Sequence, residues 1–375
     1  MSGVDYLVVA VSGRALAQSA RRAGLAVHVI DLFGDIDTRA AAGAVTVVPA
    51  DPVGGFEPAT LRSVVRVLPA DVPLVAGSGF EHAPELLDAI CRGRSCLGNP
   101  PALLERLRHP AAFFALLDEL AIPHPPVMTD GTAPDANWLV KRIGGRGGAH
   151  TGRARPGADI PSGHYLQRYA EGISLSALIL ANGETARVLG YTRHWRAQPG
   201  AGAPFRHSGM VALADEGAVS WRGQVAAIAR ALAERFNLVG LCGLDFILAG
   251  GRRDRAEVRT VQVLELNPRP PASFELHEAK QNLFSAHIEA CRGRLATAPV
   301  AAGEALHAAA VMYAAEDGTV PSAFQWPAWT ADQPAPGSRV GQGAPVCTVF
   351  GAAAAPAAAC HQVRARMRRL ATALG

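Results

Sequence analysis

The chain has 375 residues, 49% of them hydrophobic, with 36 basic and 32 acidic side chains. This length exceeds one typical hydrophobic core, so two or three domains are expected. The net charge of +4 comes from scattered arginines, without a basic block interleaved with aromatic residues, which argues against a nucleic-acid partner. No apolar stretch approaches the ~18 residues that a membrane span needs, so no membrane partner is expected.

The cysteines and the N-terminus bear on the cellular compartment. The six cysteines show no C-x-x-C spacing and no paired framework, which is typical of proteins in a reducing environment. The N-terminus has no basic segment before its short apolar run, so it does not resemble a signal peptide. We therefore expect a cytoplasmic protein with unpaired cysteines, at positions 91, 96, 242, 291, 347 and 360.

Residues 1–98 alternate short apolar strands with helical segments, which predicts a parallel sheet and a Rossmann-like α/β domain. The turn after the first strand has one glycine, Gly13, where a dinucleotide-binding fingerprint needs three, so NAD binding is not indicated. The expected strands are 6–11, 26–30, 45–48, 74–76 and 96–97, and the expected helices are 15–23, 57–68 and 84–92.

The segment G-S-G-F-E at Gly77–Glu81 follows a predicted strand and opens a predicted helix. Backbone amides at a helix N-terminus can hold an anion. A tight packing turn explains the same glycines equally well, so both interpretations stay open.

The pattern changes near residue 99, and we expect a second domain over residues 99–298. The prolines of I-P-H-P-P, which ends at Pro126, mark the entry into a new unit after two helical segments. The dipeptide Asn182-Gly183 between two apolar runs is a strong hairpin signal. Helices are expected at 103–108, 111–120, 225–236 and 278–291.

The last part of the chain is rich in alanine, proline and glycine. We expect residues 299–375 to form a small β-rich C-terminal domain. Its predicted strands are 306–313 and 345–349, and its predicted final helix is 358–373.

Glu265 and Asn267 alternate along the run V-Q-V-L-E-L-N, so both side chains leave the same face of one strand. Carboxylate and amide oxygens suit Mg²⁺, which usually shares its remaining positions with nucleotide phosphates. Asp245, on a neighbouring predicted strand, can supply a third ligand, and Arg269 can direct donors at the same phosphates. The competing interpretation is a solvated edge strand, which the apolar opposite face disfavours.

Lys141 is one of only two lysines in the chain. It ends an apolar run and precedes the glycine-rich segment I-G-G-R-G-G. Glycines let backbone amides approach phosphate oxygens, while the ammonium offsets charge. The segment does not have the Walker A pattern, and alone it is weak support for phosphate binding. The downstream metal strand strengthens that interpretation.

Four motifs occur in a fixed order: V-K-x-x-G-G-x-G-G, Q-x-Y-x-x-G, D-F and E-x-N-P-R. From about residue 99 to 290 this combination resembles the ATP-grasp superfamily, and the upstream α/β unit resembles the domain that commonly precedes that fold. The resemblance implies an α/β and α+β architecture. An ATP-grasp domain of two α+β subdomains would follow the Rossmann-like parallel domain and precede the small β-rich C-terminal domain.

The resemblance also implies roles for individual residues. Lys141 would contact the α- or β-phosphate of ATP and Arg269 the γ-phosphate, as the two catalytic residues. Asp245, Glu265 and Asn267 would hold Mg²⁺ or Mn²⁺. The rest of the ATP site would consist of Gly144, Gly145, Gly147 and Gly148 over the phosphates, Gln167, Arg168, Tyr169 and Ala170 along the adenine, and Ser174 at the ribose.

Three positions depart from the family pattern. Many members have a lysine where this chain has Arg108, and many have an acidic ribose contact where this chain offers Ser174. Leu244 stands where some amino-acid ligases have an arginine, which weakens a mechanism like that of D-alanine ligases. Whether Arg108 and Ser174 replace the missing contacts stays open.

ATP-grasp enzymes convert a carboxylate to an acyl phosphate that a nucleophile then attacks. The leading hypothesis is therefore an ATP-dependent carboxylate–amine ligase with small-molecule carboxylate and amine substrates, and with a homodimer as one option. The alternatives are a carboxylase-like or kinase-like enzyme and a non-catalytic ATP-binding sensor. The acceptor site is sought among residues of which each, taken alone, is better explained as part of the surface, and His194 also as a packing partner of Trp195. They are Arg187, Arg193, His194, Arg206, His207 and Ser208.

Two narrower resemblances rest on short motifs. The serine-rich segment after Gly172 and the proline-rich C-terminal part resemble ATP-grasp proteins of tetrahydromethanopterin and methanofuran synthesis, which implies cofactor biosynthesis in one-carbon metabolism. The C-terminal part is also similar to that of biotin carboxylases, and Ser78–Glu81 to a segment of their first domain. No A-M-K-M biotin-carrier motif occurs.

Overall fold

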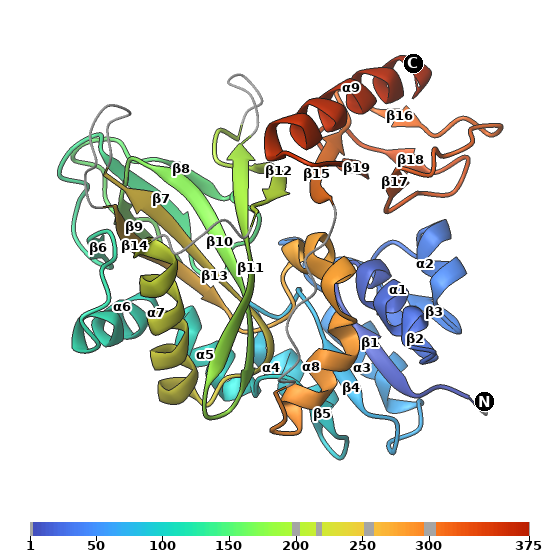
Figure 1. The fold of residues 1–375 in the computed structure, drawn as a ribbon, viewed down its shortest axis with the longest axis horizontal. Coiled ribbons are helices and arrows are strands. Elements are labelled where there is room, and N and C mark those ends of the chain that lie inside the picture. The colour runs from blue at the N-terminus through green and yellow to red at the C-terminus, as the bar shows by residue number, and fades with distance from the viewer. Residues whose placement is uncertain (1–2, 197–202, 215–219, 251–258, 296–304, 375) are drawn as a thin grey trace.

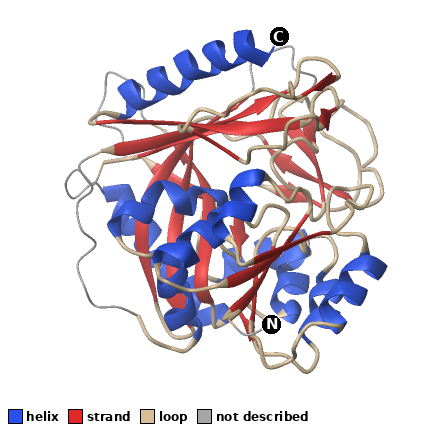
Figure 2. Cartoon of the chain, turned by 90° about the vertical axis from the view of Figure 1, so that its right-hand side faces the viewer, coloured by secondary structure: helices blue, strands red, loops and turns tan. Residues whose placement is uncertain are grey.

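The computed structural model describes residues 3–196, 203–214, 220–250, 259–295 and 305–374 (Figure 1). An N-terminal α/β unit lies beside a large antiparallel sheet, and a smaller antiparallel sheet lies on the opposite side from that unit. The final helix covers the C-terminal strands at the top of the view in Figure 2. The predicted combination of a parallel α/β part with antiparallel α+β parts is confirmed.

The N-terminal sheet is parallel, with the strand order β3-β2-β1-β4-β5. Every predicted strand and helix of this unit is present, with bounds within two residues. The short helix α2 was not predicted. Its six residues are too few to show the regular spacing of apolar side chains by which a helix is recognised in a sequence. The elements are β1 (Tyr6–Val9), α1 (Arg14–Arg22), β2 (Val27–Asp31), α2 (Ile36–Ala41), β3 (Ala44–Val47), α3 (Pro58–Arg66), β4 (Leu74–Ala76), α4 (Pro84–Cys91) and β5 (Cys96–Leu97).

The expectation of unpaired cysteines is wrong for Cys91 and Cys96, which form a disulfide. The last residue of α4 and the first of β5 are joined by a tight turn, so their Cα atoms lie 5.9 Å apart, within the usual range for a disulfide. The spacing of five residues gave no motif by which to recognise the pair. The cytoplasmic assignment loses this support and stays a prediction.

The four-stranded sheet follows two short helices and has the order β6-β9-β7-β8. The glycine-rich segment connects β7 to β8, so it is a hairpin connection at the edge of this sheet. The elements are α5 (Pro101–Arg108), α6 (Pro110–Glu119), β6 (Val127–Met128), β7 (Trp138–Arg142), β8 (Thr151–Arg153) and β9 (His164–Arg168).

The large sheet has eight strands in the order β14-β13-β10-β11-β12-β15-β19-β17. The hairpin expected at Asn182-Gly183 joins β10 to β11, which confirms that prediction. Strands from the C-terminal part continue this sheet, because β15 pairs with β12. The strands are β10 (Ile173–Asn182), β11 (Ala186–Arg196), β12 (His207–Ala212), β13 (Val239–Ala249), β14 (Thr260–Asn267), β15 (Leu306–Tyr313), β17 (Thr330–Ala331) and β19 (Pro345–Ala353).

Helices cover both faces of the large sheet. Helix α7 (Ser220–Phe236) packs Val225 and Leu232 into the core on one face, with α6. Helix α8 (Leu283–Cys291) packs on the other face and joins the N-terminal unit, where Phe284 meets Tyr6 edge-on at 5.6 Å. The C-terminal helix α9 (Pro356–Leu374) packs against β15 and β19, beside the small pair β16 (Gly318–Thr319) and β18 (Arg339–Val340).

The helix predicted at 278–291 begins later than expected. The 3₁₀ helix η1 (Ala272–Lys280) comes first, and α8 starts after Asn282, whose side chain accepts a hydrogen bond from the amide of Ser285. This N-cap separates η1 from α8, whereas the spacing of apolar residues in the sequence predicted one continuous helix. The expected domain boundary after residue 298 lies outside the described residues.

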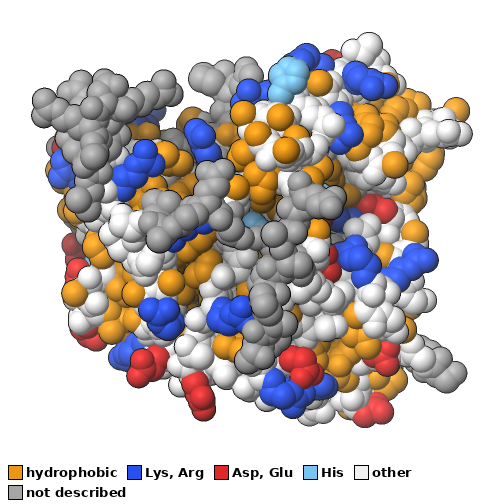
Figure 3. Space-filling model, in the orientation of Figure 1, with side chains coloured by type: hydrophobic (Ala, Val, Ile, Leu, Met, Phe, Trp, Pro, Cys, Tyr) orange, Lys and Arg blue, Asp and Glu red, His pale blue; other side chains and the backbone are white. Residues whose placement is uncertain are grey.

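None of the described helices is long and apolar enough to cross a lipid bilayer. On the face shown in Figure 3, Lys and Arg side chains are scattered among apolar and acidic ones and do not form one basic patch.

Candidate active site

A cavity of about 350 Å³ lies between the four-stranded sheet and the large sheet. Its floor consists of β10, β13 and β14, and the β7–β8 connection and the end of β9 form the opposite wall. Gly144 lies outside its lining. The other residues that the sequence assigned to ATP and the metal all line it: Lys141, Gly145, Gly147, Gly148, Gln167, Arg168, Tyr169, Ala170, Ser174, Asp245, Glu265, Asn267 and Arg269.

The two acidic residues lie side by side because Asp245 of β13 pairs in register with Glu265 of β14. The amide of Asn267 donates to Glu265 over 2.9 Å and to Asp245 over 3.3 Å. Burial and the adjacent Glu265 raise the pKa of Asp245 well above its usual range. Burial also acts to raise the pKa of Glu265, but Lys141 and the bond from Asn267 outweigh it and lower that pKa.

Lys141 lies at the end of β7 and faces this carboxylate pair across the cavity. Its side chain is 9% exposed, and its ammonium donates to Oε1 of Gln167 over 3.2 Å. Burial lowers the pKa of Lys141, but interactions with Tyr165 and Glu265 more than compensate and raise it. The ammonium therefore stays charged at neutral pH.

The end of β9 forms the wall beside Lys141. Gln167 is 2% exposed, and its Nε2 has no hydrogen-bond partner within the described part of the chain, which leaves a buried donor at the cavity. The guanidinium of Arg153 lies 3.9 Å above the ring centre of Tyr169. A flat ring and an unsatisfied donor suit a ligand with a planar, hydrogen-bonding base.

The glycine-rich connection is held between two other parts of the protein. At Gly144, with φ of 69°, a Cβ atom would lie 2.8 Å from the carbonyl oxygen of Glu81. At Gly148, with φ of 71°, it would lie 2.1 Å from the carbonyl oxygen of Phe205. Gly147 also has a positive φ, but nothing lies within 4 Å of its Cβ position. Gly144 and Gly148 are therefore required for packing, while Gly147 leaves open space at the cavity.

Arg269 is fixed by three oxygen atoms. Its Nε donates to Glu81 over 2.7 Å, and its two terminal nitrogens donate to the carbonyl of Pro270 and to Asn267. Glu81 also lies 3.8 Å from Arg146. Burial acts to raise the pKa of Glu81, but Arg269 and Arg146 outweigh it and keep the carboxyl group ionised.

This arrangement decides between the two interpretations of the Gly77–Glu81 loop. The amide of Gly79 donates to the Glu81 carboxylate of the same loop over 2.8 Å, so that amide already holds an anion of the protein itself. The loop is a packing turn that presents Glu81 to Arg269. The expectation of an external anion at this point is not supported.

Two histidines line the cavity, His194 and His207. From the sequence alone, each could have served either in packing or in substrate binding. The rings of His194 and His207 lie 5.3 Å apart, and His194 shares a 2.8 Å hydrogen bond with Ser176. Burial lowers the pKa of His207 to about 4, and burial together with His207 lowers the pKa of His194 to about 3. Both rings are neutral at pH 7.

The remaining acceptor candidates do not line this cavity. Arg206 donates to the carbonyl of Gly343 and lies 3.9 Å from the ring centre of Tyr313, so it joins β12 to the C-terminal part. Arg108 donates to the carbonyl of His82 and lines a smaller neighbouring cavity of about 100 Å³, which Lys141 and Glu265 also reach.

The donor set at the carboxylate pair fits a hard dication. The described residues contain no group of three His, Cys, Asp or Glu side chains arranged to hold a metal. Two carboxylates and one amide are instead available, and Mg²⁺ usually needs few protein ligands because phosphates and water supply the rest. Asp245, Glu265 and Asn267 are therefore a suitable but incomplete shell, which a nucleotide would complete.

Comparison with known proteins identifies the type of domain that contains this cavity. A family model described as an ATP-grasp domain matches residues 111–273. No protein in a curated sequence collection matches the chain.

Solved structures of carboxylases are similar in fold. The biotin carboxylase domain of Hydrogenobacter thermophilus 2-oxoglutarate carboxylase has a TM-score of 0.73 and 12% identity, over 96% of this chain and 88% of that one. The Campylobacter jejuni biotin carboxylase has a TM-score of 0.70 and 10% identity, over 95% and 89%. Rhizobium etli pyruvate carboxylase has a TM-score of 0.72 and 16% identity, over 98% of this chain and 37% of that one.

These matches extend beyond the central domain to the N-terminal and C-terminal parts. At such low identity they establish the fold, and the family model establishes the domain type. The resemblance drawn from the four sequence motifs is thereby confirmed for residues 111–273, which match an ATP-grasp domain, within a chain whose fold is similar to that of biotin carboxylases.

Proposed function

We propose that this protein is an ATP-dependent ligase that joins a carboxylate to an amine through an acyl phosphate. The observation that carries the proposal is one cavity in which Asp245, Glu265 and Asn267 face Lys141, with Arg269 at its edge. Phosphoryl transfer depends on positioning and on positive charge rather than on a protein nucleophile, and these residues supply both.

The residues present fit MgATP. The adenine would lie along Gln167–Ala170, where Nε2 of Gln167 has no hydrogen-bond partner among the residues that the structure describes, and Ser174 would contact the ribose. The phosphates would lie beneath the β7–β8 connection, next to the Lys141 ammonium. Mg²⁺ or Mn²⁺ would be held by Asp245, Glu265 and Asn267, and the bound ion would offset charge on the transferred phosphoryl group.

The chemistry has two steps. An oxygen of the substrate carboxylate attacks the γ-phosphorus, and the bond from that phosphorus to the leaving oxygen of ADP breaks. The nitrogen lone pair of the amine then attacks the acyl carbon, the carbon–oxygen bond to phosphate breaks, and the ammonium proton is lost. Lys141 and Arg269 place positive charge beside the oxygens that carry the negative charge in the first step.

Release of ADP from MgATP by the purified protein tests the proposal. Carboxylates and amines, including pterin and furan precursors because of the narrower resemblance, are offered singly and in pairs. A ligase releases ADP and phosphate only when both substrates are present, and EDTA stops the release. Unchanged ADP release without any carboxylate, or with EDTA, would contradict the proposed reaction.

A carboxylase is the second candidate, because the similar structures include biotin carboxylases. In that case bicarbonate and free biotin, without an amine, would stimulate ADP release. A carrier-cofactor role in one-carbon metabolism is part of the ligase proposal and is tested by the same precursors. The Hydrogenobacter neighbour is a domain dimer, and a homodimer of this chain is an expectation that sedimentation would test.

A further inference from the structure

A second cavity, of about 330 Å³, lies at the carboxyl end of the parallel sheet. It is lined by Ala10–Ser12, which follow β1, and by Gly77 and Ser78, which follow β4. In the order β3-β2-β1-β4-β5 the chain leaves β1 first toward one edge and later toward the other, so the strand order reverses between β1 and β4. Ligands of open α/β sheets bind at this point, and the volume suits a small molecule.

The second cavity adjoins the cavity of about 350 Å³ that we propose binds MgATP, which is called the nucleotide cavity below. Both are lined by Arg146, His207, Met210, Arg269, Pro271 and Ala272. A molecule in the second cavity would therefore meet Arg269 at the position where the γ-phosphate is expected. The guanidinium groups of Arg146 and Arg269 make this end of the second cavity electropositive, with Glu81 as their shared carboxylate partner.

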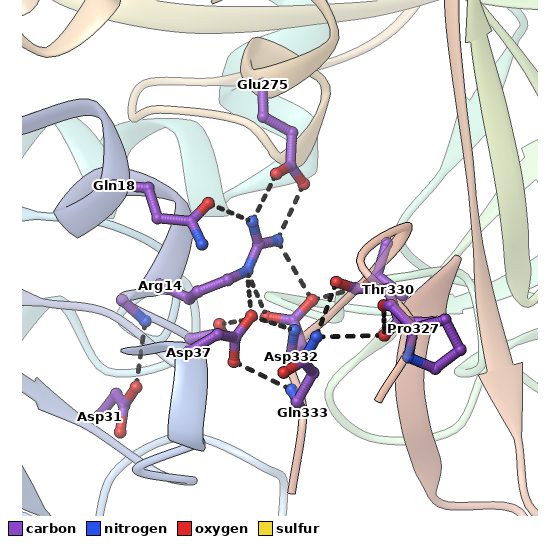
Figure 4. A network of polar contacts seen from close by, with 12 residues as sticks. Arg14, Gln18, Asp31, Asp37, Glu275, Pro327, Thr330, Asp332 and Gln333 are labelled. Atoms are coloured by element: carbon purple, nitrogen blue, oxygen red, sulfur yellow. Dashed lines mark hydrogen bonds and ion pairs between the residues drawn. The ribbon is translucent and has the colours of Figure 1, made fainter. Parts of the chain in front are cut away.

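One wall of the second cavity belongs to a network of charges centred on Arg14 (Figure 4). Arg14 comes from the start of α1, Glu275 from η1, and Asp332 from the segment after β17. Arg14 donates to both oxygens of Glu275, at 2.7 and 3.1 Å, and to both oxygens of Asp332, at 3.0 and 3.2 Å. Its Nε also lies 3.8 Å from Asp37.

Acidic groups outnumber the single guanidinium in this network. Glu275 and Asp332 line the second cavity, and Asp37, Asp35 and Asp31 lie in the adjoining part of the N-terminal unit. Each oxygen of Glu275 accepts one hydrogen bond from Arg14 and keeps a lone pair for another donor. This wall is therefore electronegative, opposite in sign to the Arg146–Arg269 end.

Both oxygens of Asp332 are already saturated, because each accepts from Arg14 and from a hydroxyl group, that of Ser12 or of Thr348. We propose that the second cavity binds the carboxylate substrate of the ligase as an aminocarboxylate, with its carboxylate at Arg146 and Arg269 and its ammonium group at Glu275. This inference rests on the proposed function and names the substrate class. The two charged ends fix one orientation, in which the carboxylate points toward the nucleotide cavity. A molecule without the amino group would leave the acidic wall unneutralised.

The first experiment compares matched substrate pairs in the ADP-release assay with MgATP and a mixture of small amines. The pairs are glycine with acetate, β-alanine with propionate, and L-glutamate with glutarate. A charge-assisted hydrogen bond to Glu275 should make aminocarboxylates roughly tenfold better substrates in kcat/KM. In Glu275→Gln, whose amide oxygen can still accept from Arg14, this ratio should fall toward one.

The second experiment fills the second cavity with larger side chains, introduced in separate variants from two different elements. Ser78 and Ala15 line the second cavity but not the first, and the Ser78 side chain makes no hydrogen bond within the described residues. Ser78→Leu and Ala15→Leu should remove stimulation by aminocarboxylates. Ser63→Leu on the exposed face of α3 is the matched control and should keep it. Calorimetry with MgADP shows that the nucleotide cavity of each variant is intact.

The outcomes separate this inference from the proposed function. Equal stimulation by acids with and without an amino group would overturn the inference while the ligase proposal stands. Full stimulation in either filled variant that binds MgADP like the parent would also overturn it. If no carboxylate stimulated ADP release in the parent, both would fail.

Discussion

The two cavities that meet at Arg269 use buried charge in opposite ways. In the nucleotide cavity the strand register places Asp245 beside Glu265, and Lys141 and Arg269 line the same space. In the second cavity Arg14 contacts its acidic partners directly and joins three parts of the chain. The charged groups of the first cavity can therefore bind a ligand, whereas those of the second also stabilise the fold through their contacts with one another. Substitutions in the two should therefore affect different properties.

The largest effect on stability is expected at Arg14. Arg14→Gln leaves Glu275 and Asp332 buried without their cation, which typically costs about 3–5 kcal/mol. Urea unfolding should show this loss. Arg22→Gln on the same helix is the matched control, because Arg22 is half-exposed at its ion pair with Glu278 and should contribute at most about 1 kcal/mol. Equal free energies of unfolding in the two variants would contradict a stabilising role of the Arg14 network.

The largest effect on activity is expected at Glu265. Glu265→Gln removes a proposed metal ligand, and ADP release should fall at least about a hundredfold. The same change removes a carboxylate that Lys141 and Asn267 stabilise in the folded state, so the free energy of unfolding should fall modestly at neutral pH. Glu184→Gln, at the exposed hairpin turn, should change neither property. Normal ADP release from Glu265→Gln would refute the metal assignment.

The smallest effect concerns pH and Asp35. Burial, with Asp332, Asp37 and Asp31 nearby, raises the pKa of Asp35 to about 7, above its ordinary value of 3.8. The folded state therefore binds the proton more tightly, and this stabilisation is complete below pH 3.8 and lost as the pH rises through 7. Asp35→Asn should raise the free energy of unfolding by about 1–3 kcal/mol at pH 8 and have little effect at pH 4. A gain that is independent of pH would contradict this account.

The sequence was sufficient to select residues that line the first cavity, because these residues come from local patterns. Alternation along one strand put Glu265 and Asn267 on the same face, and a single lysine before glycines identified Lys141. The register that brings Asp245 beside Glu265 is a property of the sheet, but motif order was enough to suggest it.

The second cavity could not be predicted in this way. Arg14 and Asp332 are 318 positions apart, and neither belongs to a recognisable motif. Among 36 basic residues, a single arginine gives no sign that it is buried. The role of Glu81 was missed for the same reason, since its partner Arg269 lies 188 positions away. Contacts between residues so far apart in the sequence become visible only in the folded chain.

Strand β12 makes contact with both ligand sites. Its first residue, His207, donates its amide proton to the carbonyl of Gly147 in the β7–β8 connection, and its later residues pair with β15 beside the second cavity. Movement of the β7–β8 connection on nucleotide binding would therefore be transmitted to a wall of the neighbouring site. Such linkage is reciprocal, so a substrate that binds more tightly after MgATP must strengthen MgATP binding by the same factor. The single strand thus provides a physical route to ordered substrate addition.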